Sequence, residues 1–402
     1  MDIAIDTRPL RHPAYRRIFV GNATSYFGTQ FTAVAVPVQM FALTHSSLWV
    51  GYLGIAGLVP LLVFAVWGGA LADVLDRRRL LLASSLLMWA GTLCLLAQAL
   101  IRVNSPVLLL VLVALQSVGV AVSSPTRNAI IPRLLPAAEV PQANTLNFTA
   151  GMAASVVGPL VAGVLIRYDV AWAYAVDAVT FSAAMWAALR LPPLPVTGAA
   201  SRGGFADVLF GLRFLVGNPL LVLSFAVDIA AMVLAMPRAL FPEVATARFG
   251  GPGAIGWLYA AIALGSVLAG LTSGWIGRVR RQGVALVVAV VGWGLAVAAA
   301  GLAGQLWLCV LLLAVGGAAD LVSAVYRQTI LQTAVPDELR GRMQGVFTAV
   351  VVGGPRLGDL RAGATAAALG TGTAWVAGGV AAAGVALLLA LVFPTLVRYR
   401  AR

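Results

Sequence analysis

The chain has 402 residues, of which 61% are hydrophobic and only 10% are charged. A water-soluble globular protein of this length cannot cover its surface with so few polar residues, so the composition excludes that class. The formal net charge of +13 is compatible with nucleic acid binding. However, the arginines lie in short segments between apolar runs, where basic residues orient helices in a membrane. We therefore expect the lipid bilayer, and no nucleic acid, as a partner.

Apolar runs of about 20 residues recur along the chain, and each is long enough to cross a bilayer. Each run is expected to be a helix, because an open segment in lipid must satisfy its own backbone hydrogen bonds. The first run is too long for a signal-peptide core, so we interpret it as an uncleaved span. The sequence thus predicts an all-α polytopic membrane protein with twelve transmembrane helices. The expected spans are 18–43, 48–72, 80–101, 106–131, 143–166, 171–191, 219–242, 254–277, 283–303, 306–331, 344–369 and 373–396.

A long connection at 192–218, rich in Pro, Gly and Arg, separates two expected six-helix bundles at 1–191 and 219–402. Its second part, from Phe205 to Val216, has the amphipathic spacing of a helix that lies on a membrane surface.

The arginines predict the orientation of the spans. Only Arg102, Arg167 and Arg248 fall in the loops on one side, whereas most of the others fall on the opposite side. Basic residues accumulate in cytoplasmic loops, so both termini are expected in the cytoplasm.

The two halves also show a weak internal repeat. With a shift of 200 residues, "TRNAIIPRLLP" (126–136) falls on "YRQTILQTAVP" (326–336), so that Arg127 matches Arg327 and Pro136 matches Pro336. Two duplicated six-helix halves are typical of transporters whose halves move about a central site.

The stretch "GGALADVLDRRR" (68–79) interrupts the apolar runs between the second and third spans. Its pattern Gly69-x-Leu71-Ala72-Asp73-x-x-Asp76-Arg77-Arg78 resembles the loop 2–3 signature of the major facilitator superfamily, although Asp76 stands where Gly is usual. The resemblance implies twelve helices in two pseudo-symmetric bundles and a cytoplasmic gate in this loop. Simple anchoring of the topology by the arginines is the alternative interpretation. The gate residues implied are Gly69, Asp73, Arg77, Arg78, Arg127 and Arg327.

A second motif lies in the fifth span. Gly158-Pro159-x-x-Ala162-Gly163 is similar to the antiporter signature of the superfamily's exporters, with Ala162 in place of one Gly. Proline interrupts the backbone hydrogen bonds and small residues allow helices to cross closely. An ordinary kinked span explains the same residues.

Three longer stretches, 34–51, 256–274 and 331–349, resemble the exporter subgroup that carries siderophores, macrolides and other drugs. The resemblance implies a monomeric secondary transporter in the bacterial inner membrane that exports a small molecule by alternating access. A proton gradient would drive it, without a cofactor. The chain has no phosphate-binding loop, so transport driven by ATP is not expected. His12 and His45 lack metal-ligand spacing, so neither a metal site nor an enzyme is expected.

Ionisable residues inside a span are costly and mark candidate sites for cargo or protons. Asp228, Asp320 and Asp177 are the proton-coupling candidates, and Asp228 is preferred because no opposite charge lies within one turn of it. The alternative for Asp228 is an ion pair with an Arg on another helix. Arg356 and Asp359, three residues apart, are expected to pair with each other.

Polar residues at helical spacing predict a cargo cavity, because spans 1, 4, 7 and 10 line the cavity in this superfamily. Hydrogen bonds between neighbouring spans are the alternative for each residue. The candidates, some shared with the coupling site, are Asn22, Tyr26, Gln30, Gln116, Ser224, Asp228, Arg238, Asp320 and Ser323.

The resemblance suggests a siderophore or a related amphipathic metabolite as the cargo, and a macrolide or another drug is the alternative. A cavity rich in arginine would suit an anionic siderophore, and one rich in free carboxylates would suit a cationic drug. An uptake carrier and a non-transporting membrane sensor are two further interpretations.

Overall fold

The structure is a computed structural model that describes residues 6–191 and 213–400. Every regular element in these two ranges is a helix, which confirms the predicted all-α class. The amphipathic helix expected between Phe205 and Val216 falls mostly outside them. Residues 213–216 form one helical turn ahead of the next long helix.

The chain divides into two units, each of which is described by itself. Unit 1 comprises Met1–Leu43 and Ala56–Gly204, and unit 2 comprises Thr44–Ile55 and Phe205–Arg402. The helix α2 (Ser47–Val74) therefore belongs to unit 2 over its first turns and to unit 1 over the rest. The sequence predicted one boundary within 192–218, and the assignment of Thr44–Ile55 to unit 2 was not predicted.

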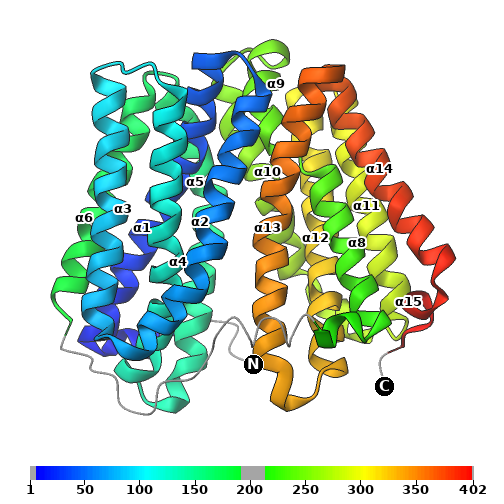
Figure 1. The fold of residues 1–402 in the computed structure, drawn as a ribbon, viewed down its shortest axis with the longest axis horizontal. Coiled ribbons are helices and arrows are strands. Elements are labelled where there is room, and N and C mark those ends of the chain that lie inside the picture. Colours follow the sequence, from blue (N-terminus) through cyan, green and yellow to red (C-terminus); the bar gives the residue numbers. More distant parts are fainter. Residues whose placement is uncertain (1–5, 192–212, 401–402) are drawn as a thin grey trace. The chain divides into compact units, whose positions relative to one another are not determined.

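Unit 1 contains six long helices joined by short connections (Figure 1). Three of them begin where a side-chain oxygen accepts a hydrogen bond from the first turn, which satisfies backbone N–H groups that have no partner in the helix. Asp76, Ser105 and Asp169 supply these oxygens. The helices are α1 (Pro13–Thr44), α2 (Ser47–Val74), α3 (Arg77–Leu100), α4 (Pro106–Leu134), α5 (Val140–Ile166) and α6 (Val170–Leu189).

Unit 2 contains six further long helices and shorter elements. Within it α12 packs beside both α10 and α11, and α14 packs beside α11 and α8 (Figure 1). The elements are α8 (Pro219–Ala235), η3 (Arg238–Leu240), α9 (Phe241–Arg248), α10 (Gly253–Leu271), η4 (Ser273–Arg278), α11 (Gln282–Leu302), α12 (Leu306–Ala334), α13 (Asp337–Leu369), α14 (Thr371–Val392) and α15 (Pro394–Arg398).

Ten helical stretches of the described residues are long and apolar enough to cross a membrane. The two remaining long helices, α1 with 32 residues and α13 with 33, carry more polar side chains along their length. Together these twelve match the twelve predicted spans one by one. The chain is therefore a helical membrane protein that crosses the bilayer repeatedly.

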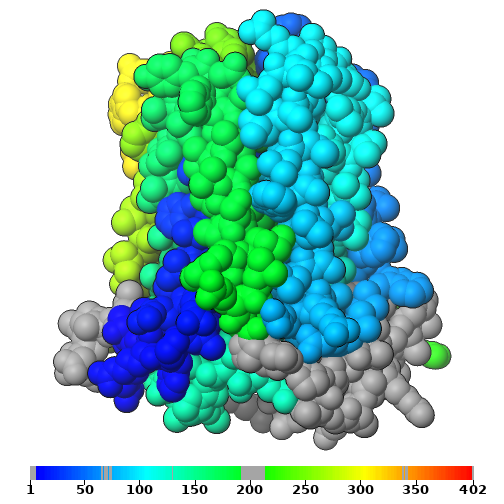
Figure 2. Space-filling model, turned by 90° about the vertical axis from the view of Figure 1, so that its left-hand side faces the viewer, coloured from blue at the N-terminus to red at the C-terminus, as the bar shows by residue number. Residues whose placement is uncertain are grey.

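Large apolar side chains cover the outside of unit 1. Figure 2 shows one face of this unit, on which α3 and α6 lie side by side. On these two helices Leu86, Trp172, Val179 and Trp186 are all more than half exposed. A patch of this kind would be unfavourable in water, but in a bilayer it contacts the acyl chains.

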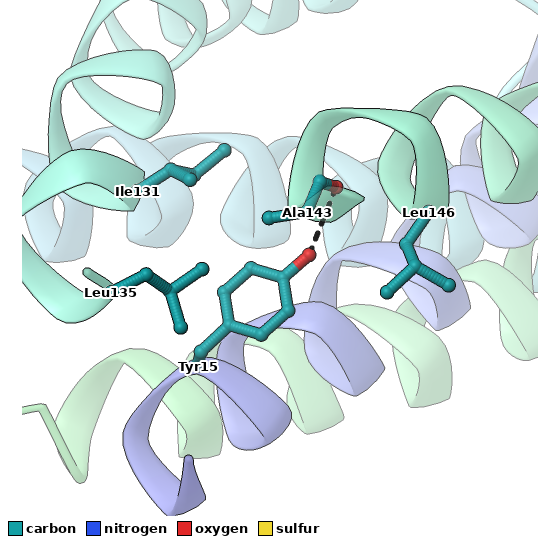
Figure 3. Packing of buried hydrophobic residues seen from close by; sticks show 5 residues of the cluster. All are labelled: Tyr15, Ile131, Leu135, Ala143 and Leu146. Atoms are coloured by element: carbon teal, nitrogen blue, oxygen red, sulfur yellow. Dashed lines mark hydrogen bonds between the residues drawn. The ribbon is translucent and has the colours of Figure 1, made fainter. Parts of the chain in front are cut away.

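A small buried cluster fixes the beginning of α1 against α4 and α5. Figure 3 shows Tyr15 surrounded by Ile131, Leu135, Ala143 and Leu146. The Tyr15 hydroxyl donates a 3.0 Å hydrogen bond to the Ala143 carbonyl oxygen, so the polar end of this buried ring has a partner.

The backbones of α10 and α12 approach each other without intervening side chains. A Cβ atom added to Gly317 would overlap the Ile262 carbonyl oxygen, and one added to Gly265 would overlap the Ala314 carbonyl oxygen. The Ser266 hydroxyl donates a 2.9 Å hydrogen bond to the Gly317 carbonyl oxygen across the same contact. Lipid provides no hydrophobic drive between helices, so such close packing stabilises the pair.

We expect Gly317→Ala to destabilise the protein by about 1–3 kcal/mol, because the new methyl group forces α10 and α12 apart. Thermal unfolding in detergent measures the effect. Gly384→Ala is the matched control, since Gly384 lies in α14 with nothing within 4 Å of an added Cβ. Equal unfolding temperatures for the two variants would contradict the close packing.

Candidate functional site

The seventh predicted span lies within a membrane-spanning stretch, Pro219–Arg248, but this stretch contains a break that was not predicted. The helix α8 ends at Ala235, and η3 and α9 follow after Met236 and Pro237. Pro237 has no N–H to continue the hydrogen-bond ladder. Arg361 compensates for the break by donating hydrogen bonds to the carbonyl oxygens of Val233 and Leu234 at the end of α8.

An ion-paired cluster connects α8 with α12 inside unit 2. The Arg327 guanidinium forms a salt bridge with Asp228, and it lies 3.8 Å from the carboxylate of Asp320. Asp320 and Arg327 stand seven residues apart and therefore on one face of α12. The cluster brings together three residues that the sequence marked separately, and Asp228 has the interhelical partner that was the alternative expectation for it.

The members of this cluster differ in exposure. The side chains of Arg327 and Asp228 are 5% and 3% exposed, whereas that of Asp320 is 31% exposed. Two carboxylates share one guanidinium, so the cluster carries one net negative charge when both are ionised. Such a group is stable in a membrane interior only because its charges face one another. Asp320 is therefore the least buried member of the cluster.

The expected ion pair between Arg356 and Asp359 does not form in unit 2, and that prediction is wrong. Arg356 Nη1 and Asp359 Oδ1 are both buried without a hydrogen-bond partner. Asp359 instead accepts a hydrogen bond from the backbone N–H of Ala239. Its charge interacts with those of Arg238, Arg356 and Arg361 without a salt bridge to any of them, and Arg238 also interacts with Asp320. Asp359 thus bonds to η3, which is distant in sequence, and not to Arg356 three residues earlier on α13.

In unit 1 the corresponding arginine has a different neighbour. Arg127 on α4 donates a hydrogen bond to the hydroxyl group of Tyr26 on α1. Its Nε is buried with no hydrogen-bond partner, and so is the Ser123 hydroxyl one turn earlier. Among the residues that the structure describes, no carboxylate forms a salt bridge with Arg127.

Asp177 on α6 lies in a hydroxyl-rich network of unit 1. It is 1% exposed and accepts hydrogen bonds from Thr32 and, at 3.4 Å, from Thr92. Gln116 extends the network by donating a 3.0 Å hydrogen bond to the Thr92 hydroxyl. This network joins α1, α3, α4 and α6, so hydrogen bonding between spans accounts for Gln116.

The loop 2–3 motif is described only in part. The backbone of α2 continues to Val74, but the surroundings of Gly69 and the side chain of Asp73 lie outside what the structure describes. Asp76 accepts a 3.0 Å hydrogen bond from the Arg79 N–H and begins α3. Arg78 donates a 2.7 Å hydrogen bond to the Leu189 carbonyl oxygen at the end of α6. The Asp before an apolar run is a helix-start signal, and it explains the residue that departs from the family pattern.

The fifth-span motif faces α1. Gly158, Pro159 and Gly163 are all buried. A Cβ atom on Gly158 would lie 2.5 Å from the Cβ of Gln30, so this glycine allows α5 and α1 to cross closely. The buried Asn22 lies two turns earlier on α1.

Two cavity candidates of unit 2 are involved in the bundle's own packing. The Ser224 hydroxyl donates a 2.8 Å hydrogen bond to Leu221 within α8. Ser323 is 2% exposed, and its carbonyl oxygen accepts a 3.3 Å hydrogen bond from Arg327 Nε.

One acidic residue of unit 2 was not predicted. Glu243 at the start of α9 accepts hydrogen bonds from the hydroxyl groups of Ser47 and Thr371. It thereby ties the first turn of α2 to the first turn of α14. The signal available in the sequence was a single Glu in the apolar stretch that follows Pro237.

The geometry combines twelve membrane helices with charged groups in the interior, which is the arrangement of a transporter and offers no catalytic cluster among the described residues. Solved transporter structures share the fold. The nucleoside transporter NupG superposes with a TM-score of 0.78 over 96% of this chain and 99% of its own, at 16% identity. A bacterial homologue of the human lysosomal transporter Spinster superposes with a TM-score of 0.71 over 97% of each chain, also at 16% identity. Both superpositions show that this chain has the same fold as these transporters.

Sequence comparison places the protein among the membrane transporters of the major facilitator superfamily. The model of the transmembrane secretion effector family matches residues 5–401, so the chain belongs to that family. The enterobactin exporter EntS of Salmonella typhi is 31% identical over 97% of this chain and 94% of its own length. EntS of Escherichia coli O81 is 30% identical over the same shares.

We expect Arg327→Gln and Asp228→Asn each to destabilise the protein, by about 3–5 kcal/mol where a charge is left buried and unpaired. The double variant should lose less than the sum of the two single losses, because neither charge then remains. Unfolding in detergent provides the free energies for this double-mutant cycle.

Arg280→Gln is the control for this cycle, since Arg280 is exposed. Asp320 stays close to Arg327 in the Asp228→Asn variant, so Arg327→Gln should be the more damaging single change. Strictly additive losses would contradict a direct interaction between Asp228 and Arg327.

Proposed function

We propose that this protein exports a siderophore related to enterobactin, by alternating access and at the expense of a proton gradient. The main support for a siderophore as the cargo is the 31% identity to the enterobactin exporter. The similarity covers 97% of this chain and 94% of that exporter, so it is not confined to a shared half or motif. We further propose that it acts as a monomer in the bacterial inner membrane, as its relationship to the exporters suggests. The distribution of its arginines supports an orientation with both termini in the cytoplasm.

The cluster of Asp228, Arg327 and Asp320 supports the proton-coupling part of the proposal. We assign the exchangeable proton to Asp320, whose side chain is 31% exposed, and a fixed counter-ion role to Asp228, whose side chain is 3% exposed. Protonation of Asp320 leaves Arg327 with Asp228 as its one carboxylate partner. Release of the proton restores both carboxylate partners. In a low-dielectric interior that change of one charge is large enough to bias which conformation of the transporter is populated.

Proton flux in proteoliposomes tests the function. A pH-sensitive dye in the lumen reports proton movement when enterobactin is added and, separately, when a macrolide is added. We expect flux with enterobactin and none with the macrolide. Flux with the macrolide alone would replace the siderophore by a drug as cargo, and flux with neither would contradict the proposal.

We expect Asp320→Asn to reduce enterobactin-dependent proton flux to the rate of liposomes without protein, because the amide cannot exchange the coupled proton. Enterobactin binding to the purified variant should persist. Asp228→Asn should abolish flux as well, since the counter-ion that holds Arg327 is lost. Asp169→Asn is the control, because Asn serves equally well as the N-cap of α6. Normal flux in Asp320→Asn would place proton exchange elsewhere.

A further inference from the structure

The two units present the same short pattern on equivalent helices. The helix α4 runs from Pro106 to Leu134, and α12 runs from Leu306 to Ala334, so both ends are related by a shift of 200 residues. Under this shift Ser123 corresponds to Ser323 and Arg127 to Arg327. Each unit therefore carries a serine and, one turn later, an arginine at the same place in its bundle.

The partners of the two arginines differ in charge. The first helix of the second half, α8, supplies Asp228 to Arg327 as a salt-bridge partner. The first helix of the first half, α1, supplies the Tyr26 hydroxyl to Arg127. Tyr26 and Asp228 are 202 residues apart, close to the shift that relates the helices. The position that holds a carboxylate in unit 2 thus holds a neutral phenol in unit 1.

The Arg127 charge is consequently not compensated by the protein among the residues that the structure describes. Its Nε and the Ser123 hydroxyl are buried without a hydrogen-bond partner, and Arg127 as a whole is half-buried. Asp177, a buried carboxylate of unit 1, accepts its hydrogen bonds from Thr32 and Thr92 instead. A desolvated guanidinium with free donors binds carboxylate or phenolate oxygens strongly.

We propose that Arg127, assisted by Tyr26, binds the anionic oxygen of the cargo, whereas Arg327 is neutralised within its own unit. The assignment rests on the proposed transport function and names the residue that selects for negative charge in the transported molecule. The Tyr26 hydroxyl accepts a hydrogen bond from Arg127 and orients the guanidinium while leaving its positive charge intact. A residue that serves the gate alone would not discriminate between charged and neutral ligands.

Two probes of one shape isolate the charge. Salicylate carries a carboxylate and salicylamide a neutral amide on the same phenol ring. Equilibrium dialysis against the purified protein in nanodiscs measures the affinity of each probe. We expect the wild-type protein to bind salicylate at least ~10-fold more tightly than salicylamide, in line with a charge-assisted hydrogen bond.

Variants of the pair then test the assignment. Arg127→Gln should abolish the preference for salicylate without weakening salicylamide binding. Tyr26→Asp copies the arrangement of unit 2 into unit 1 and should abolish the preference in the same way while Arg127 is still present. Tyr26→Phe should keep a reduced preference. Arg133→Gln, the same change at an exposed position of α4, is the matched control and should leave the preference unchanged.

Size-exclusion profiles and unfolding temperatures identify variants that do not fold, and Tyr26→Phe keeps the test valid if Arg127→Gln is lost. A wild-type protein without preference, or an Arg127→Gln variant that retains it, overturns the proposal. Absence of enterobactin-dependent proton flux together with an Arg127-dependent preference would reject the proposed cargo and support the anion site. Enterobactin-dependent proton flux without a preference for salicylate would support the proposed cargo and reject the anion site at Arg127.

Discussion

A charged group inside a membrane bundle must find its partner in the protein or in a bound ligand, because lipid supplies neither counter-ions nor hydrogen bonds. The pairing of Asp228 with Arg327 meets this requirement and holds α8 against α12 at mid-length. Arg361 meets it at the end of α8 by binding the last carbonyl oxygens, and it also donates a hydrogen bond to the Ala374 carbonyl oxygen on α14. Two arginines thus connect α8 with its neighbours in unit 2: Arg327 with α12, and Arg361 with α13 and α14.

The break after α8 depends on the same constraint. Without Arg361 the interruption at Pro237 would leave backbone carbonyl groups unsatisfied in the membrane. With it, the chain can turn into η3 and place the Ala239 N–H against Asp359. This contact is also the reason why Asp359 does not pair with Arg356, three residues earlier on the same helix.

The sequence predicted the number, order and approximate limits of the long helices, because each is recorded locally as an apolar run. Partners brought together by tertiary packing were not predictable in that way. Asp228 and Arg327 lie on helices far apart in the chain, so the charges were visible and their pairing was not. Pro237 was visible too, but only the folded structure shows that it ends α8. Glu243 was missed because its partners, Ser47 and Thr371, come from two other helices.

The membership of α2 in both units has a mechanical consequence. Its first turns belong to unit 2, where the backbone of Gly51 and Gly54 lies tightly against that of α13 and Ser47 is bonded to Glu243. Its remaining turns belong to unit 1, and the division falls between Ile55 and Ala56. Pro60 lies inside the helix and cannot donate to the Ala56 carbonyl oxygen, so α2 lacks one rung of its ladder just where it passes from one unit to the other. A helix bends most readily at such a point, so a bend in α2 is expected next to Pro60, where the helix passes from one unit to the other.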